Sequence, residues 1–487
     1  MEKTWDLAII GAGVSGAAIA RRLSAYNLEV VLIEKEADVS FGVSKANSGI
    51  IHGGFHHDTT SLKSRLELQG NRMFDQLKEE LHFPFERCGI IVAAMNSEEM
   101  RTVEKLYDQG VKNRIVGVEL CNRERIHALE PKLNPDVVGG MFAPGGGIIE
   151  PYRFVFSLVE SARKNGVSLL TNWEVSGAAF RDGAHEMVNQ KGEKLRAAYV
   201  VNAAGLYADK VSSLFGAEEF TITPRKGEEY LMDRNAKAYT RRVVFPVPGS
   251  VSKGMLVIPT VEGTTMVGPT AEDAESKEDS ATTRENFEKI FYSARRLVPS
   301  VSERDIITSF VGLRPALEGD DFFIDISGKA KQFIQVAGIQ SPGLTASPAI
   351  GEYVKDLLKK AGLKLAEKTE WKPEIQALPR IRSASPTEAD RLIQENPAFG
   401  EIVCRCESIS EAEIVAAIRA GHDTLDGIKF YTRAQMGRCQ GGFCTYRILK
   451  ILQRETGMAL EEITKRGGGS YIVKRTLAEP GLSGEAR

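Results

Sequence analysis

Three glycines near the N-terminus have the spacing of a turn that binds phosphate groups. Gly11, Gly13 and Gly16 follow the apolar run 7–10 and precede a series of alanines. This pattern is typical of a buried parallel strand, a tight turn and a helix packed closely on the sheet. The first glycine permits the turn, the second admits a pyrophosphate close to the backbone, and the third lets the helix contact the strand. Because free amides at a helix N-terminus carry partial positive charge, a diphosphate is the expected ligand.

An acidic residue extends this prediction to a whole dinucleotide. The second apolar run, 30–33, ends at Glu34, where a carboxylate accepts hydrogen bonds from a ribose diol and repels a 2′-phosphate. Glycines in a turn of this kind can also be purely structural. The combination of strand, turn, helix, second strand and acid favours a bound adenine dinucleotide, and the acid argues against NADP.

Four cysteines near the C-terminus form a second group that could carry chemistry. Cys404 and Cys406 are two residues apart, and Cys439 and Cys444 are five apart. Clustered thiols in a chain that begins without a secretion signal indicate metal ligands rather than disulfides. Four thiolates suit zinc and iron–sulfur clusters alike, so the spacing by itself leaves both open.

Helices are expected around these cysteines. Ser410 and Glu413 match a capping box, which predicts a helix that begins there and ends near Gly421. Further helices are expected over about 425–433 and 446–452. These helices would bring the two cysteine pairs together.

The longer N-terminal part combines several patterns. The run 40–51 is rich in small and polar residues and can lie extended along a ligand. Apolar residues at helical spacing predict an amphipathic helix over 62–81. Residues 76–140 form an insertion with strands and helices of their own, and 223–312 consist of short β segments separated by turn residues. We therefore expect a dinucleotide-binding domain interrupted by a mixed-sheet domain that covers the ligand.

The composition is that of an ordinary globular protein. The chain has 487 residues, 42% hydrophobic and 26% charged, with a net charge of −2, and its length predicts two or three domains. The charge provides no basic surface for nucleic acid, and no apolar run is long enough to span a bilayer. Because the chain runs into its first strand without a signal peptide, the expected location is cytoplasmic. The isolated Cys88 and Cys121 are expected to be buried hydrophobic residues.

The N-terminal motifs resemble those of a known superfamily. GAGVSGAAIA, Glu34 and SKANSGIIHGGFHHD are similar to motifs of the D-amino-acid-oxidase-type FAD oxidoreductases, which include glycerol-3-phosphate dehydrogenases and L-2-hydroxyglutarate dehydrogenases. The turn NAAG at 202–205 matches a second flavin-contacting turn, and the resemblance extends over 6–365. It implies that the dinucleotide is FAD. The residues that it implies for FAD binding are Gly11, Gly13, Gly16, Glu34, Lys35, Ser44, Asn47, Ser48, His52, Val175, Ala204, Gly205, Gly338, Gly343, Leu344 and Thr345.

Three of these positions have specific roles in the superfamily. His52 lies where some relatives attach the flavin covalently, although many relatives do not. The backbone at Val175 is expected to meet adenine, and the helix that begins at Gly343 is expected to point its positive end at the flavin pyrimidine.

The cysteine motifs resemble a second family. CRCE and MGRCQGGFC are similar to the bacterioferritin-associated-ferredoxin-like [2Fe-2S] module, which is also fused to catalytic subunits of anaerobic glycerol-3-phosphate dehydrogenases. The resemblance favours a [2Fe-2S] cluster over zinc at Cys404, Cys406, Cys439 and Cys444.

The expected fold is therefore α/β, with a Rossmann-like FAD-binding domain, an inserted mixed-sheet substrate domain and a small helical C-terminal iron–sulfur domain. The FAD-dependent oxidoreductase part is expected at 1–365. Its FAD-binding segments are placed at about 1–75, 141–222 and 310–365, its substrate-domain segments at about 76–140 and 223–309, a linker at 366–398, the [2Fe-2S] domain at 399–466 and a tail at 467–487.

The resemblance also indicates how a substrate would bind. Arg314 is the expected anchor for an anionic group, because a guanidinium suits carboxylate or phosphate and the matching arginine has this role in the family; a surface ion pair is the alternative. Either His56 or His57 is expected to remove a hydroxyl proton. The weaker candidates for a second anion contact are Arg225, Lys226 and Lys253.

A flavin combined with a one-electron cluster implies a dehydrogenase that passes electrons onward. We expect oxidation of sn-glycerol 3-phosphate to dihydroxyacetone phosphate. Because Phe55-His56-His57 replaces the arginine and tyrosine of many such enzymes, L-2-hydroxyglutarate or another 2-hydroxy or amino acid is the alternative. An electron-transfer subunit without its own substrate is a further alternative. The expected partners are an electron-acceptor protein or a quinone-linked subunit, with no nucleic acid and at most peripheral membrane association through a partner.

Overall fold

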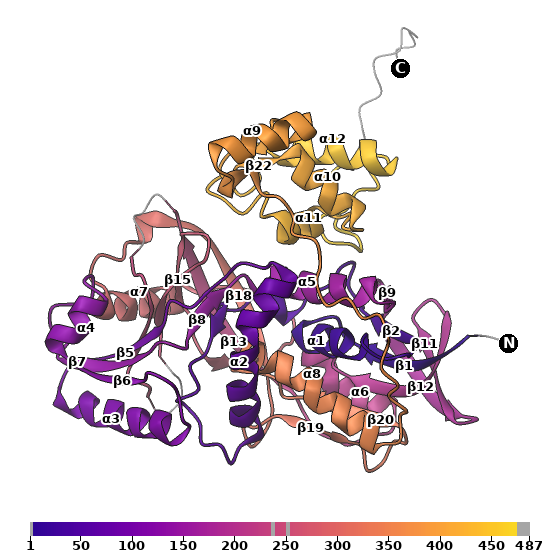
Figure 1. Ribbon diagram of the computed structural model, residues 1–487, viewed down its shortest axis with the longest axis horizontal. Coiled ribbons are helices and arrows are strands. Elements are labelled where there is room, and N and C mark those ends of the chain that lie inside the picture. The colour runs from indigo at the N-terminus through magenta and orange to yellow at the C-terminus, as the bar shows by residue number, and fades with distance from the viewer. Residues whose placement is uncertain (1–2, 235–238, 250–253, 475–487) are drawn as a thin grey trace, which may run out of the picture. The chain divides into compact units, whose positions relative to one another are not determined.

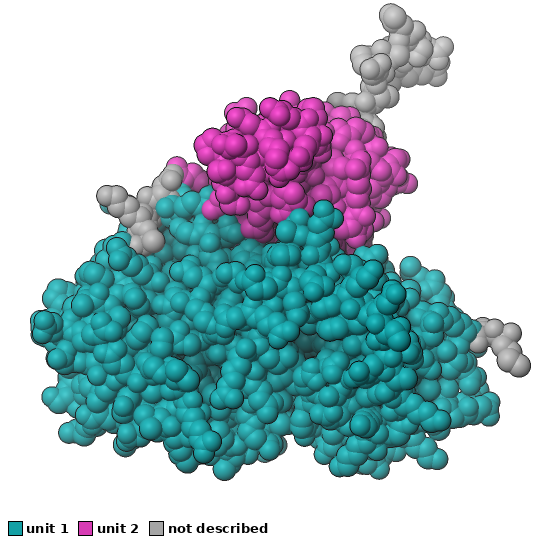
Figure 2. All heavy atoms as spheres, viewed as in Figure 1, with its two compact units in different colours: residues 1–35, 39–377 teal, residues 36–38, 378–487 magenta. Residues whose placement is uncertain are grey.

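A computed structural model describes residues 3–234, 239–249 and 254–474. Lys253, one of the weaker anion-contact candidates, and the part of the expected tail beyond 474 lie outside the described residues. The chain divides into two compact units, one of residues 1–35 and 39–377 and the other of residues 36–38 and 378–487 (Figure 2).

The first unit contains a Rossmann-like sheet. The apolar run of β1 lies at its centre, parallel to β2 on one side and β12 on the other, and further parallel strands β9 and β20 extend it. The hairpin β10–β11 and the antiparallel β19 complete the sheet. The strands are β1 (Thr4–Ile10), β2 (Val30–Ile33), β9 (Ser168–Leu170), β10 (Val175–Arg181), β11 (Ala184–Asn189), β12 (Lys194–Asn202), β19 (Phe323–Ile326) and β20 (Phe333–Ala337).

Helices α1, α2, α5 and α8 pack beside one another next to this sheet (Figure 1). The small residues of α1 are almost all buried, which lets the helix approach the strands closely. The helices of this part are α1 (Val14–Leu23), α2 (Leu62–Leu81), α5 (Pro151–Lys164), α6 (Ala208–Leu214) and α8 (Gly343–Lys360).

A nine-stranded mixed sheet forms the second part of this unit. Successive residues of β5 alternate between two apolar clusters, one that includes residues of α7 and one that includes Val103 of α3, so both faces of the sheet are covered. The elements are β5 (Ile90–Ala94), α3 (Ser97–Lys112), β6 (Glu119–Asn122), α4 (Arg123–Leu129), β7 (Gly139–Ala143), β13 (Thr223–Met232), β14 (Val243–Pro246), β15 (Leu256–Pro259), β16 (Thr265–Gly268), β17 (Glu272–Asp273), α7 (Arg284–Leu297) and β18 (Ile306–Ala316).

The small, polar segment 40–51 ends in a strand of a three-stranded sheet. Its order is β3-β8-β4, with β3 (Ile50–Ile51), β8 (Gly147–Ile149) and β4 (Phe85–Glu86). Antiparallel pairing with β8 fixes both β3 and β4.

The second unit is small and mainly helical. It contains α9 (Pro386–Glu395), β21 (Ile402–Cys404), β22 (Ile409–Ser410), α10 (Glu411–Arg419), α11 (Leu425–Thr432) and α12 (Thr445–Thr456). The predicted capping box is confirmed, because Ser410 and Glu413 bond each other's backbone reciprocally. The stretch expected as a linker, 366–398, contains α9. This short helix begins with Ser385 as its cap and Pro386 in its first turn, and Leu392 is its buried residue.

Candidate active site and cysteine centre

The glycine turn leaves no room for side chains. A Cβ at Gly11 would lie 2.4 Å from the carbonyl oxygen of Ala203, and one at Gly16 would lie 1.9 Å from the carbonyl oxygen of Gly11. Gly11 also has a φ of +104°, which disfavours any other residue. The turn, α1 and the end of β12 therefore come together at one edge of the sheet.

Polar side chains surround the N-terminus of α1. The amide of Ala12 donates a 2.8 Å hydrogen bond to Glu34 Oε2, and the amide of Val14 donates a 2.9 Å bond to Ser44 Oγ. A dinucleotide phosphate at the α1 N-terminus would lie beside Ser44, with the acid of Glu34 at the end of the next strand. This donor set fits the diphosphate and ribose of FAD.

The segment 44–52, which we call the flavin strip, is fixed at several points. Asn47 closes a turn by donating to the carbonyl of Ser44 and accepting from the amide of Gly49. The amide of His52 donates to Thr345 Oγ1 over 2.9 Å, and His52 Nε2 lies 3.1 Å from Ser341 Oγ. The strip is thereby joined to the beginning of α8.

The other residues expected at FAD occupy ends of strands and starts of helices in the same unit. Ala204 and Gly205 form the turn after β12, where Gly205 has a φ of +57°. Lys35 Nζ lies 4.0 Å from the ring centroid of Tyr207 in that turn. Val175 begins β10, Gly338 follows β20 with a φ of +70°, and the first turn of α8 contains Gly343, Leu344 and Thr345.

One face of the mixed sheet lies against the flavin strip. In the β13–β18 pair, Arg225 is opposite Arg314 and Gly227 is opposite Gly312, so these residues share a face. A Cβ at Gly312 would lie only 2.0 Å from the carbonyl oxygen of Ala46 in the strip. Arg314 therefore projects from the sheet face that covers the strip.

The guanidinium of Arg314 is held over Gly227. Its Nη2 lies 2.6 Å from the position of a Cβ at Gly227, and both terminal nitrogens donate to the carbonyl of Thr270 at 3.2 Å. Among the described residues Arg314 has no acidic ion-pair partner, which argues against the surface ion-pair interpretation. The side chain can therefore still meet an anion.

Glu229 is a site residue that the sequence reasoning missed. It lies on the same face as Gly227 and is only 2% exposed, and its Oε1 accepts a 3.1 Å hydrogen bond from Ser48. Burial raises the pKa of Glu229 to about 7, although Arg314 and the Ser48 hydroxyl lower it in part. In the sequence, the feature that could have indicated Glu229 is an acidic residue at the start of an expected β segment, two residues after Gly227.

The histidines lie close to one another. The His56 ring stacks on Phe55 at 4.2 Å between centroids and is 5.9 Å from the His52 ring, whereas the His57 ring is 6.3 Å from that of His56. His52 and His56 both pack against Phe245. The structure thus groups His52 with His56.

The weaker anion-contact candidates have acidic partners. Arg225 pairs with Asp273 at 2.8 Å, and Lys226, on the opposite face, pairs with Asp279 at 2.9 Å. Arg225 and Lys226 therefore each have an acidic ion-pair partner, whereas Arg314 has none among the described residues.

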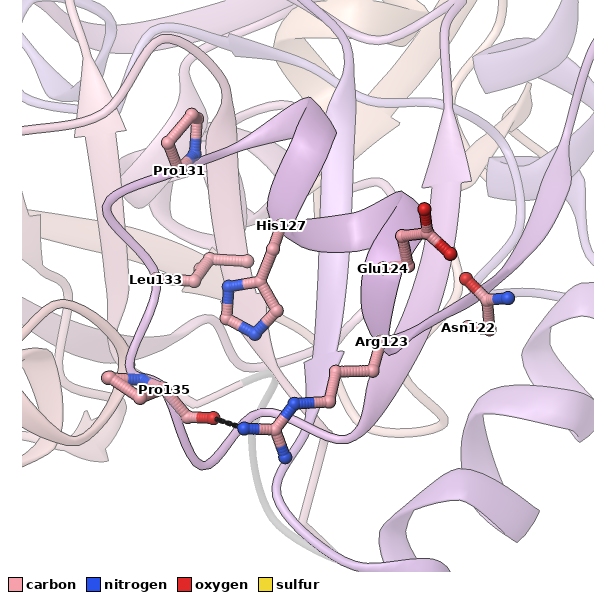
Figure 3. A pocket seen from close by; sticks show the side chains of 7 residues that line it. All are labelled: Asn122, Arg123, Glu124, His127, Pro131, Leu133 and Pro135. Carbon is pink, nitrogen blue, oxygen red and sulfur yellow. Dashed lines mark hydrogen bonds between the residues drawn. The ribbon is translucent and has the colours of Figure 1, made fainter.

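A separate open hollow lies at α4 and the loop after it (Figure 3). It has a volume of about 740 Å³ and is lined by Asn122, Arg123, Glu124, His127, Pro131, Leu133 and Pro135. Arg123 donates to the carbonyl of Pro135 across it. None of the residues expected at the site lines this hollow.

The four clustered cysteines come together in the second unit. The Sγ atoms of Cys404 and Cys406 are 3.8 Å apart, as are those of Cys406 and Cys439. A hydrogen bond between the sulfurs of Cys404 and Cys444 lowers the pKa of Cys444. Burial opposes ionisation of Cys439, but the amides of the loop 441–443 outweigh it and lower the pKa of that thiol.

The loop around the cysteines is closely packed. A Cβ at Gly437 would lie 2.5 Å from Cys406 Sγ, so the glycine makes room for the sulfur. Within the described ranges, no three His, Cys, Asp or Glu side chains meet the geometry for a single metal ion. The donor set is all sulfur, which fits an iron–sulfur cluster; the choice against zinc depends on the family to which the unit belongs.

The isolated cysteines differ from these four. Cys121 is buried, and Cys88 is partly buried. Burial raises the pKa of the Cys88 thiol to about 12, so this side chain is a neutral thiol at physiological pH.

Within the described parts of the chain, no helix has the length and apolar character required to cross a bilayer.

The fold and the site define a dinucleotide-binding oxidoreductase with a sulfur-rich second unit. Residues 6–357 match the family model of FAD dependent oxidoreductases, and residues 402–454 match the BFD-like [2Fe-2S] binding domain. The chain belongs to the FAD dependent oxidoreductase family, binds FAD and carries a [2Fe-2S] domain.

Three similar proteins cover most of the chain. A glycerol 3-phosphate dehydrogenase of Caloramator mitchellensis is 43% identical over 96% of this chain and 98% of its own length. The human mitochondrial L-2-hydroxyglutarate dehydrogenase is 28% identical over 72% of this chain and 88% of its own. The solved structure of dithionite-reduced L-alpha-glycerophosphate oxidase from Mycoplasma pneumoniae with FAD bound matches with a TM-score of 0.74 and 31% identity, over 77% of this chain and 99% of that one.

Proposed function

We propose that this protein is an FAD-dependent dehydrogenase that oxidises sn-glycerol 3-phosphate to dihydroxyacetone phosphate. The observation that carries this proposal is the 43% identity with the C. mitchellensis glycerol 3-phosphate dehydrogenase over 96% of the chain, which spans both units. The relation to the M. pneumoniae glycerophosphate oxidase supports the same substrate for the first unit.

The chain's own residues have complementary roles in this proposal. FAD, held by the glycine turn and the flavin strip, would supply the acceptor for a hydride from C2 of the substrate. The free donors of Arg314 bind the phosphate and thereby hold the substrate against the flavin strip. A histidine takes the proton of the C2 hydroxyl, and the candidates remain His56 and His57, of which His56 is packed beside His52.

The [2Fe-2S] domain supports a route for the electrons. We propose that Cys404, Cys406, Cys439 and Cys444 would hold a [2Fe-2S] cluster, which would supply one-electron transfer toward an acceptor protein or a quinone-linked subunit. We also propose that the enzyme acts in the cytoplasm. A cluster exchanges one electron at a time, so it suits a partner that is itself a one-electron carrier.

L-2-hydroxyglutarate is the second candidate substrate. The 28% identity with the human L-2-hydroxyglutarate dehydrogenase supports it, and its carboxylates would suit Arg314 as well as a phosphate does. Both candidates are small anionic alcohols.

An anaerobic spectrum separates the candidates. We expect the flavin bands of the purified protein to disappear on addition of glycerol 3-phosphate and to persist with L-2-hydroxyglutarate, while cluster absorbance remains. The reverse result would transfer the assignment to the 2-hydroxy acid. Flavin bands that respond to neither compound, but only to a protein donor, would favour an electron-transfer subunit.

A further inference from the structure

Arg314 and Glu229 project side by side from one face of the mixed sheet. They come from adjacent strands β18 and β13, and the guanidinium lies over Gly227, two residues before Glu229. Same-face neighbours on a strand are separated by about 7 Å. The side chains are close enough to influence each other's pKa, yet they form no ion pair in the described part of the chain.

Each of these groups keeps unused hydrogen-bonding capacity. Arg314 donates only to the carbonyl of Thr270 among the described residues. Glu229 Oε1 is held by Ser48, whereas the buried Oε2 has no hydrogen-bond partner among the described residues. An unpaired oxygen on a 2% exposed carboxyl is costly unless a ligand completes it.

We propose that Glu229 is a second substrate-binding residue, whose protonated carboxyl donates a hydrogen bond from Oε2 to an oxygen of the anionic group that Arg314 holds. Binding of the anion then takes up a proton on Glu229. This inference rests on the proposed function in one respect, namely that the substrate carries an anionic group next to its reacting alcohol.

The charges around Glu229 support proton uptake. Arg314 of β18 is the charged group that lowers the pKa of Glu229. Ser48 of the flavin strip donates a hydrogen bond from its neutral hydroxyl. The backbone of Gly268 packs against the Glu229 side chain and brings no charge. The positive charge of Arg225 on β13 lowers the pKa of Arg314, but Arg225 is itself paired with Asp273. An anion on Arg314 cancels the positive charge that favours ionised Glu229, so the carboxyl becomes protonated.

The test measures binding rather than turnover. Dihydroxyacetone phosphate and 2-oxoglutarate, the two candidate products, are titrated into oxidised holoenzyme, followed by flavin absorbance and by calorimetry in two buffers of different ionisation enthalpy. At about pH 8, where Glu229 is mostly ionised, we expect uptake approaching one proton per bound ligand. Affinity of the wild type should fall roughly twentyfold between about pH 6.5 and 8.5.

Glu229→Gln separates this role from a structural one. The amide keeps a neutral donor and cannot ionise, so the variant should bind without the extra proton and with a flatter pH profile. Near pH 8.5, Glu229→Gln should therefore bind the product more tightly than the wild type does. Glu228→Gln is the matched control, because Glu228 points to the opposite face and is bonded to Thr283 and Asn286; it should retain the wild-type profile.

The outcomes distinguish this inference from the proposed function. Equal proton uptake and equal pH profiles in wild type and Glu229→Gln overturn the role of Glu229, whichever product binds. Binding of 2-oxoglutarate alone, with an uptake that Glu229→Gln abolishes, supports Glu229 and overturns the glycerol 3-phosphate assignment. Failure of both products to bind the holoenzyme overturns both proposals.

Discussion

At the scale of single residues, substrate affinity is expected to depend most on Arg314. Arg314→Lys keeps the positive charge but loses the planar fork that can pair with Thr270 and an anion together. A charge-assisted hydrogen bond contributes about 1.5–3 kcal/mol, so KM should rise roughly 10- to 100-fold while kcat changes much less. Steady-state kinetics with an artificial acceptor would measure both constants.

The control for this substitution is Arg295→Lys. Arg295 is a half-exposed arginine on α7 paired with Glu303, and its replacement should leave KM unchanged. If Arg314→Lys also left KM unchanged, Arg314 would not be the anion anchor.

Some residues of this site could be predicted from their type and spacing, and others could not. The glycines at 11, 13 and 16 could be interpreted because each has a steric task that only glycine performs, and the structure confirms the close contacts at Gly11 and Gly16. Glu229 could not be found, because its importance depends on which strand face meets the flavin strip. That face is set by pairing with β18, more than 70 residues later in the chain.

At the scale of elements, the contact between β18 and the flavin strip should control flavin retention. In Gly312→Ala the new methyl would need to displace the backbone at Ala46, because the ideal position is 2.0 Å from that carbonyl oxygen. Overpacking of this kind costs about 1–3 kcal/mol. We expect a lower ratio of flavin to protein absorbance and a lower melting temperature.

Gly145→Ala provides the comparison for Gly312→Ala. A Cβ at Gly145 meets nothing within 4 Å, so the variant should keep its flavin. Full flavin occupancy in Gly312→Ala would show that the strip can move away from β18 without loss of the binding site.

Most elements could be predicted, but their boundaries between sheets could not. The helix over 62–81 and the capping box at 410–413 have strong local signals, and both are present. The expected change of domain at 310 falls inside β18, which runs without a break through the mixed sheet from Ile306 to Ala316. Apolar strand residues look alike whichever sheet they join, since sheet membership is decided by distant partners.

At the scale of the whole molecule, the two compact units should allow flavin chemistry and cluster chemistry to be separated. Cys439→Ser removes one thiolate, so the purified variant should lose its iron, its acid-labile sulfide and the EPR signal of the reduced cluster. Reduction of the flavin by substrate under nitrogen should proceed at the wild-type rate. Cys88→Ala, which replaces a partly buried neutral thiol, should keep both cofactors.

Two results would contradict this expectation. A Cys439→Ser variant with stoichiometric iron would remove Cys439 from the ligand set. A variant that loses flavin together with iron would show that the units depend on each other for stability.

The order of the two units along the chain has an evolutionary consequence. Apart from residues 36–38, the cysteine unit follows residue 377 rather than interrupting the first unit, and 77% of this chain already matches 99% of the M. pneumoniae oxidase. A module that does not interrupt the first unit can be gained or lost without breaking the chain of that unit. Lineages could therefore exchange the terminal electron acceptor while inheriting the alcohol-oxidising machinery unchanged.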